Sequence, residues 1–85
     1  MYQLQLTKQA RRALKKMPRN QSKLIQKKLI TLATDPYSQN NNATKLQNRD
    51  GYRLRIGDWR VIYEIVDDKL VILVMKIAGR GDIYR

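Results

Sequence analysis

The 85-residue chain contains no cysteine and no histidine. Without cysteine it has no disulfide and no thiolate metal site. Without histidine it lacks the commonest general base and metal ligand, and with them every Ser-His and Cys-His nucleophile pair. A glycine-rich phosphate loop is missing as well. The sequence therefore predicts neither a metal site nor a cofactor, and any catalysis has to come from other side chains.

Long hydrophobic runs are also absent. The longest, Leu70 to Met75, is far too short to cross a bilayer. The first residues lack the basic segment followed by an apolar segment that marks a signal peptide. No linker or repeat interrupts the chain, and its length suits one small domain. We therefore expect a single domain over residues 1–85, cytoplasmic and without membrane contact.

Acidic residues are few and unevenly placed. The chain has 18 Lys and Arg against seven Asp and Glu, a net charge of +11, and residues 1–34 contain no carboxylate. Like charges at helical spacing cost about 0.2–0.5 kcal/mol per pair. Either this is a solvated basic face, or a polyanion or acidic protein relieves the repulsion. The candidate contacts are Lys8, Arg11, Arg12, Lys15, Lys16, Lys23 and Lys27.

Hydrophobic periodicity divides the chain into a helical first half and a β-rich second half. Tyr2, Leu4 and Leu6 alternate with glutamine, which predicts a short strand. Thr7 can then cap a helix that ends before Pro18. A second helix is expected from about residue 20 to residue 33. After an amide-rich loop the period changes to two and predicts three strands: Tyr52–Ile56, Trp59–Val66 and Lys69–Ala78.

This order of elements predicts an α+β fold. We expect the N-terminal strand and the helical hairpin to pack on one face of a four-stranded, mainly antiparallel sheet. The predicted core face of the sheet carries Leu54, Ile56, Trp59, Val61, Tyr63, Ile65, Leu70, Ile72 and Val74.

A two-residue turn at Gly57-Asp58 would set the register of the hairpin. Arg55 then lies opposite Arg60, with Arg53 on the same face. Two arginines across a strand pair repel, which suggests an anion between them, and phosphate matches guanidinium best. Alternatively, Glu64 neutralises Arg55 or Arg60 diagonally. The same face carries apolar residues that a partner protein would cover: Ile62, Val66, Val71, Leu73 and Met75.

The last seven residues place Arg80 between Gly79 and Gly81, and end on Tyr84-Arg85. Glycines on both sides let the backbone bend freely, so Arg80 can swing out of the register of the sheet. Tyr84 is the better of two aromatic candidates for stacking on a base, the other being Tyr37, which we expect to anchor its loop. A frayed basic terminus is the alternative.

Read in order, these segments resemble the RelE-type toxins of the RelE/ParE superfamily, found in bacterial toxin–antitoxin pairs. The likeness covers essentially the whole chain. It rests on the strand–helix–helix start and on four segments in fixed order: Lys45-Leu46, Gly51-Tyr52-Arg53-Leu54-Arg55, Trp59-Arg60-Val61-Ile62-Tyr63 and Gly79-Arg80-Gly81-Asp82-Ile83-Tyr84-Arg85.

The resemblance implies a metal-independent, ribosome-dependent mRNA endoribonuclease. Such an enzyme cuts the transcript in the ribosomal A site, where the RNA 2′-hydroxyl attacks the adjacent phosphate. The basic helix residues named above would bind ribosomal RNA and mRNA, and a small antitoxin would form a heterocomplex with the toxin. Carried over residue by residue, the catalytic set is Arg53, Arg55, Arg60, Arg80 and Tyr84.

One departure from the family concerns the second of these segments. The best-known member has lysines where this chain has Arg53 and Arg55. Arginine stays protonated up to about pH 12, so it is a poor general base, but it can stabilise charge on the transition state.

Two other functions stay open: a gyrase-inhibiting toxin of the ParE branch, and a protein that binds ribosome or RNA without cutting.

Overall fold

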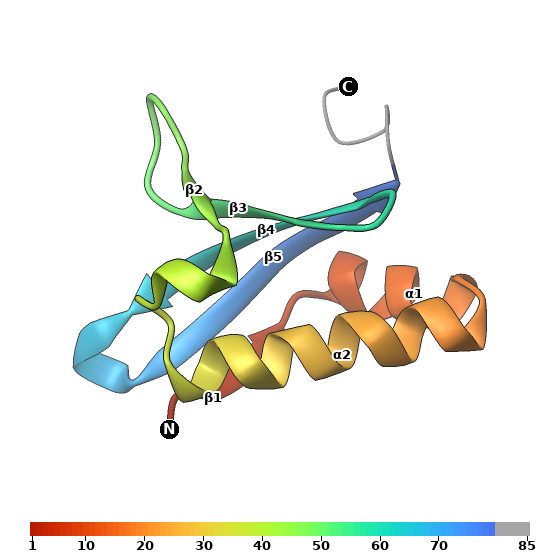
Figure 1. Ribbon diagram of the computed structural model, residues 1–85, viewed down its shortest axis with the longest axis horizontal. Coiled ribbons are helices and arrows are strands. Elements are labelled where there is room, and N and C mark those ends of the chain that lie inside the picture. Colours follow the sequence, from red (N-terminus) through yellow and green to blue (C-terminus); the bar gives the residue numbers. More distant parts are fainter. Residues whose placement is uncertain (80–85) are drawn as a thin grey trace.

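The structure is a computed structural model that describes residues 1–79. Two helices lie along one face of a twisted sheet, and the opposite face is left without a helix (Figure 1). Neither helix in this part of the chain is long and apolar enough to span a membrane. The elements are β1 (Gln3–Leu6), α1 (Lys8–Lys16), α2 (Arg19–Thr34), η1 (Gln39–Asn41), β2 (Thr44–Lys45), β3 (Tyr52–Ile56), β4 (Trp59–Val66), η2 (Asp67–Lys69) and β5 (Val71–Gly79).

The sheet has five strands in the order β1-β5-β4-β3-β2. Strand β1 runs parallel to β5 and every other pair is antiparallel, which confirms the predicted α+β, mainly antiparallel architecture. The expectation of four strands was wrong, because Thr44 and Lys45 pair with Arg53 and Tyr52 as an additional edge strand. Two residues are too few to produce a periodic pattern, so the sequence carries no signal for β2.

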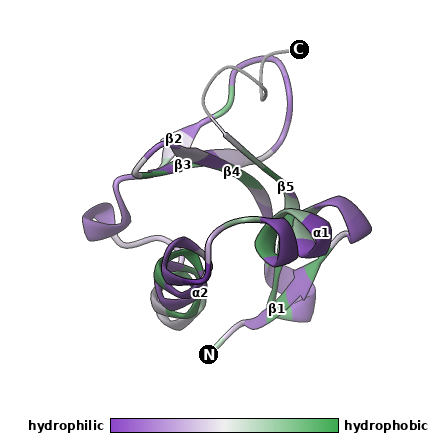
Figure 2. Ribbon diagram, turned by 90° about the vertical axis from the view of Figure 1, so that its right-hand side faces the viewer, coloured by the Kyte–Doolittle hydropathy of each residue, from purple (hydrophilic) through white to green (hydrophobic). Residues whose placement is uncertain are grey.

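Both helices cover the same face of the sheet, as the view along the helices shows (Figure 2). The Thr7 side chain caps α1 as expected, accepting a hydrogen bond from the Ala10 amide at 3.3 Å. Helix α2 begins directly after Pro18. The helices and strands enclose a core whose largest fully buried side chains are Ile25, Leu29, Leu32, Val61, Tyr63, Ile72, Val74 and Ile77.

The β3–β4 hairpin has the predicted register. Gly57 takes a positive φ of 58° in the turn, and the pairs run from Ile56 opposite Trp59 to Tyr52 opposite Tyr63. Glycine adopts a positive φ without the steric cost that a Cβ brings, which accounts for this residue in a tight hairpin turn. Trp59 is half-buried rather than fully in the core, and its indole Nε1 donates to Gln21 at 2.8 Å.

The start of β5 differs from the expected strand at Lys69. Residues 67–69 form the 3₁₀ turn η2, and Leu70 follows in the left-handed region with φ 52°. Leu70 is therefore 55% exposed, although its parity predicted a core position. A left-handed residue ends the alternation of faces, so the pairing of β5 begins at Val71.

A bulge divides β5 and corrects a second expectation. Tyr63 pairs with Val74 and Ile62 with Lys76, so Met75 is an extra residue with no opposite partner on β4. Beyond a bulge the alternation of side chains is inverted. Lys76, rather than Met75, is therefore the residue that lies beside Ile62 on the face away from the helices.

A hydrogen-bonded cluster ties the loop after α2 to the far end of the sheet. The carboxylate of Asp67 accepts hydrogen bonds from the hydroxyls of Tyr37 and Tyr2, the latter at 2.7 Å. These bonds lower the pKa of Asp67, that from Tyr37 most, and the same bond raises the pKa of Tyr37 to about 12. The predicted role of Tyr37 as a loop anchor is confirmed.

We expect this cluster to weaken in acid. The pKa of Asp67 is lowered from 3.8 by folding, so its ionised form stabilises the folded state fully above that pH and loses its effect as the pH falls below it. Asp67→Asn should remove this part of the pH dependence of the free energy of unfolding, measured by urea denaturation. Asp68→Asn in the same turn should keep it. Equal pH profiles for wild type and Asp67→Asn would contradict the assignment.

Gly51 and Gly57 make a matched pair for a test of backbone packing. Gly51 has φ 116°, and a Cβ there would lie 2.9 Å from the carbonyl oxygen of Tyr63. Gly57 also has a positive φ, but a Cβ there would meet no heavy atom within 4 Å. We expect Gly51→Ala to lower the free energy of unfolding by about 3 kcal/mol and Gly57→Ala by about 1–2 kcal/mol. If chemical denaturation shows the same loss of free energy of unfolding for both variants, the close approach of Gly51 to the Tyr63 carbonyl does not contribute to the cost.

Candidate functional site

Three arginines share the sheet face that the helices leave uncovered. Arg55 lies directly opposite Arg60, and Arg53 lies on the next row of that face, opposite Ile62. The shared face follows from the register, as predicted. Arg55 is exposed, whereas Arg53 and Arg60 are half-buried. We call this surface of β3, β4 and β5 the arginine face; it is the upper face in Figure 1.

Arg60 carries a buried guanidinium nitrogen. Its Nη1 atom is buried, and among residues 1–79 it has no hydrogen-bond partner. A buried donor without an acceptor is costly, more so when it carries charge. An anion seated between Arg60 and Arg55 would satisfy this donor and offset the repulsion between the two guanidinium groups. The geometry therefore suits an oxyanion such as phosphate.

Glu64 does not neutralise the pair as the alternative supposed. It lies four residues along β4 from Arg60, roughly 13 Å away at the backbone. Its diagonal neighbour across the hairpin is Arg53, because Arg53 pairs with Ile62. Among the described residues of β3, β4 and β5 the only carboxylate is therefore Glu64, which lies diagonally beside Arg53 and not beside the Arg55–Arg60 pair, and this favours an external anion.

The apolar residues of the arginine face are less exposed than expected. Ile62, Val66 and Leu73 are half-buried, and Val71 is only 7% exposed. Met75, the inserted residue of the bulge, is half-buried as well. The expectation of an exposed apolar patch is corrected to this extent, since neighbouring side chains on the sheet shield most of each residue. The face is nevertheless uncovered by any helix.

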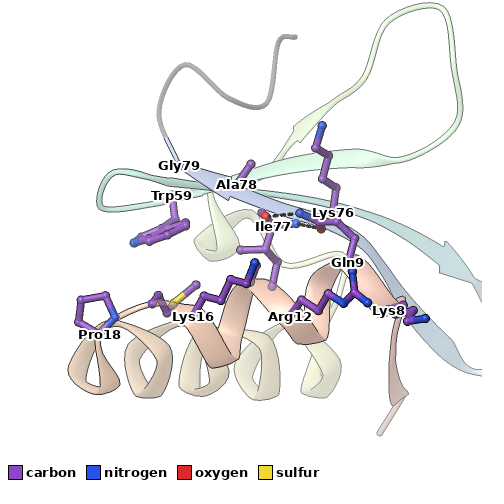
Figure 3. A pocket seen from close by; sticks show the side chains of 12 residues that line it. Lys8, Gln9, Arg12, Lys16, Pro18, Trp59, Lys76, Ile77, Ala78 and Gly79 are labelled. Carbon is purple, nitrogen blue, oxygen red and sulfur yellow. Dashed lines mark hydrogen bonds between the residues drawn. The ribbon is translucent and has the colours of Figure 1, made fainter.

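Lys76 was not among the residues predicted for the site. Regular alternation along β5 would turn this side chain toward the helices, but the bulge at Met75 places it opposite Ile62 on the arginine face. Figure 3 shows Lys76 pointing away from α1. A bulge leaves no simple pattern in a single sequence, although a charged residue at a position predicted to be buried was a signal that the register changes.

The seven cations predicted on the helices are all exposed, but they form separate groups. Lys8, Arg12 and Lys16, one helical turn apart, border a groove of about 600 Å³ between α1 and the end of β5. Trp59 closes one end of this groove (Figure 3). Lys15 and Lys23 border a second cleft, between the two helices, while Arg11 and Lys27 border neither groove nor cleft. Because both helices cover the face opposite the arginine face, the helix cations lie on the helical side of the sheet, and the groove reaches Lys76 and Ala78 at the edge of β5.

The remaining predicted site residues, Arg80 and Tyr84, lie outside the described residues. The last described residue, Gly79, pairs with Trp59, and Ala78 pairs with Arg60. The described part of β5 thus extends one residue beyond the row that contains Arg55 and Arg60. Within residues 1–79 no cluster of three acidic side chains could hold a metal ion.

The chain matches a known protein family over most of its length. Residues 4–84 match the family described as "ParE toxin of type II toxin-antitoxin system, parDE". This match spans nearly the whole chain. The chain belongs to the RelE/ParE superfamily of type II toxins.

Relatives of this superfamily member come from archaea and bacteria. A Methanocaldococcus jannaschii protein named as toxin RelE1 is 29% identical over 86 residues, covering 99% of this chain and 96% of that protein. RelE in the archaeal RelE–RelB complex from Pyrococcus horikoshii is 29% identical, with a TM-score of 0.82 over 95% of this chain and 97% of that one. The isolated E. coli RelE toxin, 24% identical, has the same fold, with a TM-score of 0.79 over 99% and 92% of the two chains.

We expect this RelE/ParE-superfamily toxin to bind free phosphate at Arg60. Phosphate at ten times its Kd should raise the free energy of unfolding by about 1.4 kcal/mol, compared with chloride at equal ionic strength. Arg60→Ala should abolish this gain, measured by thermal unfolding. Lys69→Ala, which removes the same charge from the exposed η2 turn, should preserve it. A gain that survives in Arg60→Ala would place the anion elsewhere.

Proposed function

We propose that this type II toxin is a ribosome-dependent mRNA endoribonuclease of the RelE type. The observation that carries the proposal is the arginine face, where Arg55 and Arg60 oppose each other and Nη1 of Arg60 is buried without a partner in the described chain. That arrangement suits a phosphate whose negative charge increases during reaction. Arg80 and Tyr84, which follow β5 in the sequence, would complete the site.

The proposed reaction needs no metal. The 2′-hydroxyl of one nucleotide attacks the adjacent phosphorus, a new P–O bond forms, and the bond to the 5′-oxygen of the next nucleotide breaks. The 2′-hydroxyl loses a proton and the leaving oxygen gains one. Arginines are unsuited to move these protons but well suited to stabilise the pentacoordinate phosphorane. The site would therefore act mainly through positioning and charge stabilisation.

The ribosome would supply the positioning. The helix cations lie on the opposite side of the sheet from the arginine face, so they can contact ribosomal RNA while the arginine face meets the message. Long-range attraction between a protein of net charge +11 and RNA would speed encounter. On this basis we expect naked RNA to be cut poorly in the absence of ribosomes.

A small antitoxin is the proposed protein partner. RelE of Pyrococcus horikoshii was crystallised with RelB, and E. coli RelE in the RelBE complex. In this chain the carboxylate-free residues 1–34 would attract an acidic segment, and the uncovered arginine face would receive part of it. An antitoxin that orders on binding could wrap both surfaces.

Inhibition of gyrase is the second candidate function, because the family that matches residues 4–84 is named for ParE. The two functions leave different products in growing cells. After induction of the protein, 5′ ends of a translated message that fall within codons would support mRNA cleavage. Trapped gyrase–DNA breaks with an intact message would support the ParE-type function. A stalled but intact message without DNA breaks would indicate a ribosome binder that does not cut.

Substitution of the proposed catalytic arginines should slow the cleavage step and leave ribosome binding unchanged. Arg60→Ala and Arg80→Ala should each lower the single-turnover rate of cleavage on programmed ribosomes by about 10²–10³-fold, because each removes a donor to transition-state charge. Ribosome binding, measured by co-sedimentation, should be nearly unchanged. Arg11→Ala on α1 should instead weaken binding and reduce its salt dependence. If both arginine variants cleave normally while Arg11→Ala does not, the active site lies on the helical side.

A further inference from the structure

Lys76 reaches the arginine face only because β5 contains a bulge. Ile62 pairs with Lys76 and Tyr63 with Val74, so Met75 is inserted between them. Without the insertion Lys76 would face α1 and the core. Bulges commonly re-aim a side chain beside a functional site. The bulge therefore adds a cation to a surface that already carries Arg53, Arg55 and Arg60.

The start of α1 holds the bulged segment on both sides of Lys76. The Thr7 hydroxyl donates to the carbonyl of Met75 at 2.7 Å. The side-chain amide of Gln9 donates to the carbonyl of Ile77 at 2.9 Å and accepts from its N–H at 3.0 Å (Figure 3). The Gln9 side chain thus makes the two hydrogen bonds to Ile77 that a residue of a neighbouring strand would otherwise make. With both flanking residues anchored, the backbone at Lys76 is fixed and its side chain points away from α1.

The cations of the arginine face lie on two adjacent rows across the sheet. One row contains Arg55, Arg60 and Ala78, and the other contains Arg53, Ile62 and Lys76. The rows are two residues apart along the strands, roughly 6.5 Å. That separation is comparable with the distance between neighbouring phosphates of an extended nucleic-acid strand.

Arg53 and Lys76 stand on either side of Ile62. Their backbones are two strand spacings apart, roughly 9.6 Å, and both side chains are long enough to meet above the small apolar surface between them. Arginine offers two parallel donors to a phosphate, and lysine adds a point charge. The pair therefore forms a second place where an oxyanion can be held.

We propose that Arg53 and Lys76 form a second phosphate subsite, one row from the Arg55–Arg60 pair, so that the arginine face holds two successive phosphates of one RNA strand. This inference rests on RNA being the ligand of the proposed function. It assigns Arg55 and Arg60 to one phosphate, and Arg53 and Lys76 to its neighbour. Holding both would fix the nucleotide between them and set the register of the strand on the sheet.

Binding of a modified RNA tests the subsite without any cleavage. The probe is a short, fluorescent 2′-O-methyl RNA, which cannot undergo 2′-hydroxyl attack, with one linkage at a time replaced by an uncharged methylphosphonate. Binding is followed by fluorescence anisotropy at low salt, where the +11 charge favours association. For wild type we expect two adjacent linkages at which the substitution weakens binding roughly 3- to 10-fold.

The variants assign each linkage to a row. Lys76→Ala should lose the methylphosphonate effect at one of the two linkages, and its salt slope should fall by about 0.7. Arg60→Ala should lose the effect at the other linkage. Lys76→Arg should keep both effects. Lys69→Ala, the control with the same loss of charge at the far end of the hairpin, should also keep both effects.

Two outcomes would overturn the subsite: both effects persisting in Lys76→Ala, or only one sensitive linkage in wild type. Failure of the proposed function would look different. In that case wild type would show both effects on the probe but would leave translated mRNA intact on programmed ribosomes.

Discussion

Burial of one face of the β3–β4 hairpin constrains the rest of the structure. The pairing set by the turn at Gly57 directs Leu54 and Val61 into the core. Because side chains alternate, Arg55 and Arg60 are then forced together on the opposite face. A slip of one residue would bury two guanidinium groups without partners, which costs far more than the repulsion between them. The contacts that stabilise the fold therefore also assemble the candidate site.

The second constraint is the fit between α1 and β5. β1 pairs with β5 only as far as Leu6 and Val74, so beyond that point the edge of β5 needs other hydrogen-bond partners. Side chains from the first turn of α1 and its cap supply them, at Met75 and Ile77. The same bonds stabilise the bulge that turns Lys76 outward. The hydrogen bonds that satisfy the open edge of β5 thus also add the charge of Lys76 to the arginine face.

The cations of this superfamily member lie on two separate surfaces. The outer sides of the helices carry cations without any carboxylate in residues 1–34, and the arginine face carries four more cations and Glu64. Self-repulsion at a net charge of +11 destabilises the free protein, and polyanions on either side relieve it. Under the proposed function, a ribosome that presents RNA to the helices and a message to the sheet would be such an environment, and an acidic antitoxin would be another.

Local periodicity and turn chemistry were enough to determine most elements of this protein. The alternation in Tyr52–Ile56 and Trp59–Val66, the Gly57-Asp58 turn and the Thr7 cap act over a few residues, so the sequence alone predicted both helices, the hairpin register and the shared face of Arg53, Arg55 and Arg60. Contacts between distant segments decided the rest. The two-residue strand β2 exists only because β3 is there to pair with it. The bulge at Met75, and with it the position of Lys76, depends on hydrogen bonds from Thr7 and Gln9, some 68 residues away in the chain, which no local pattern can record.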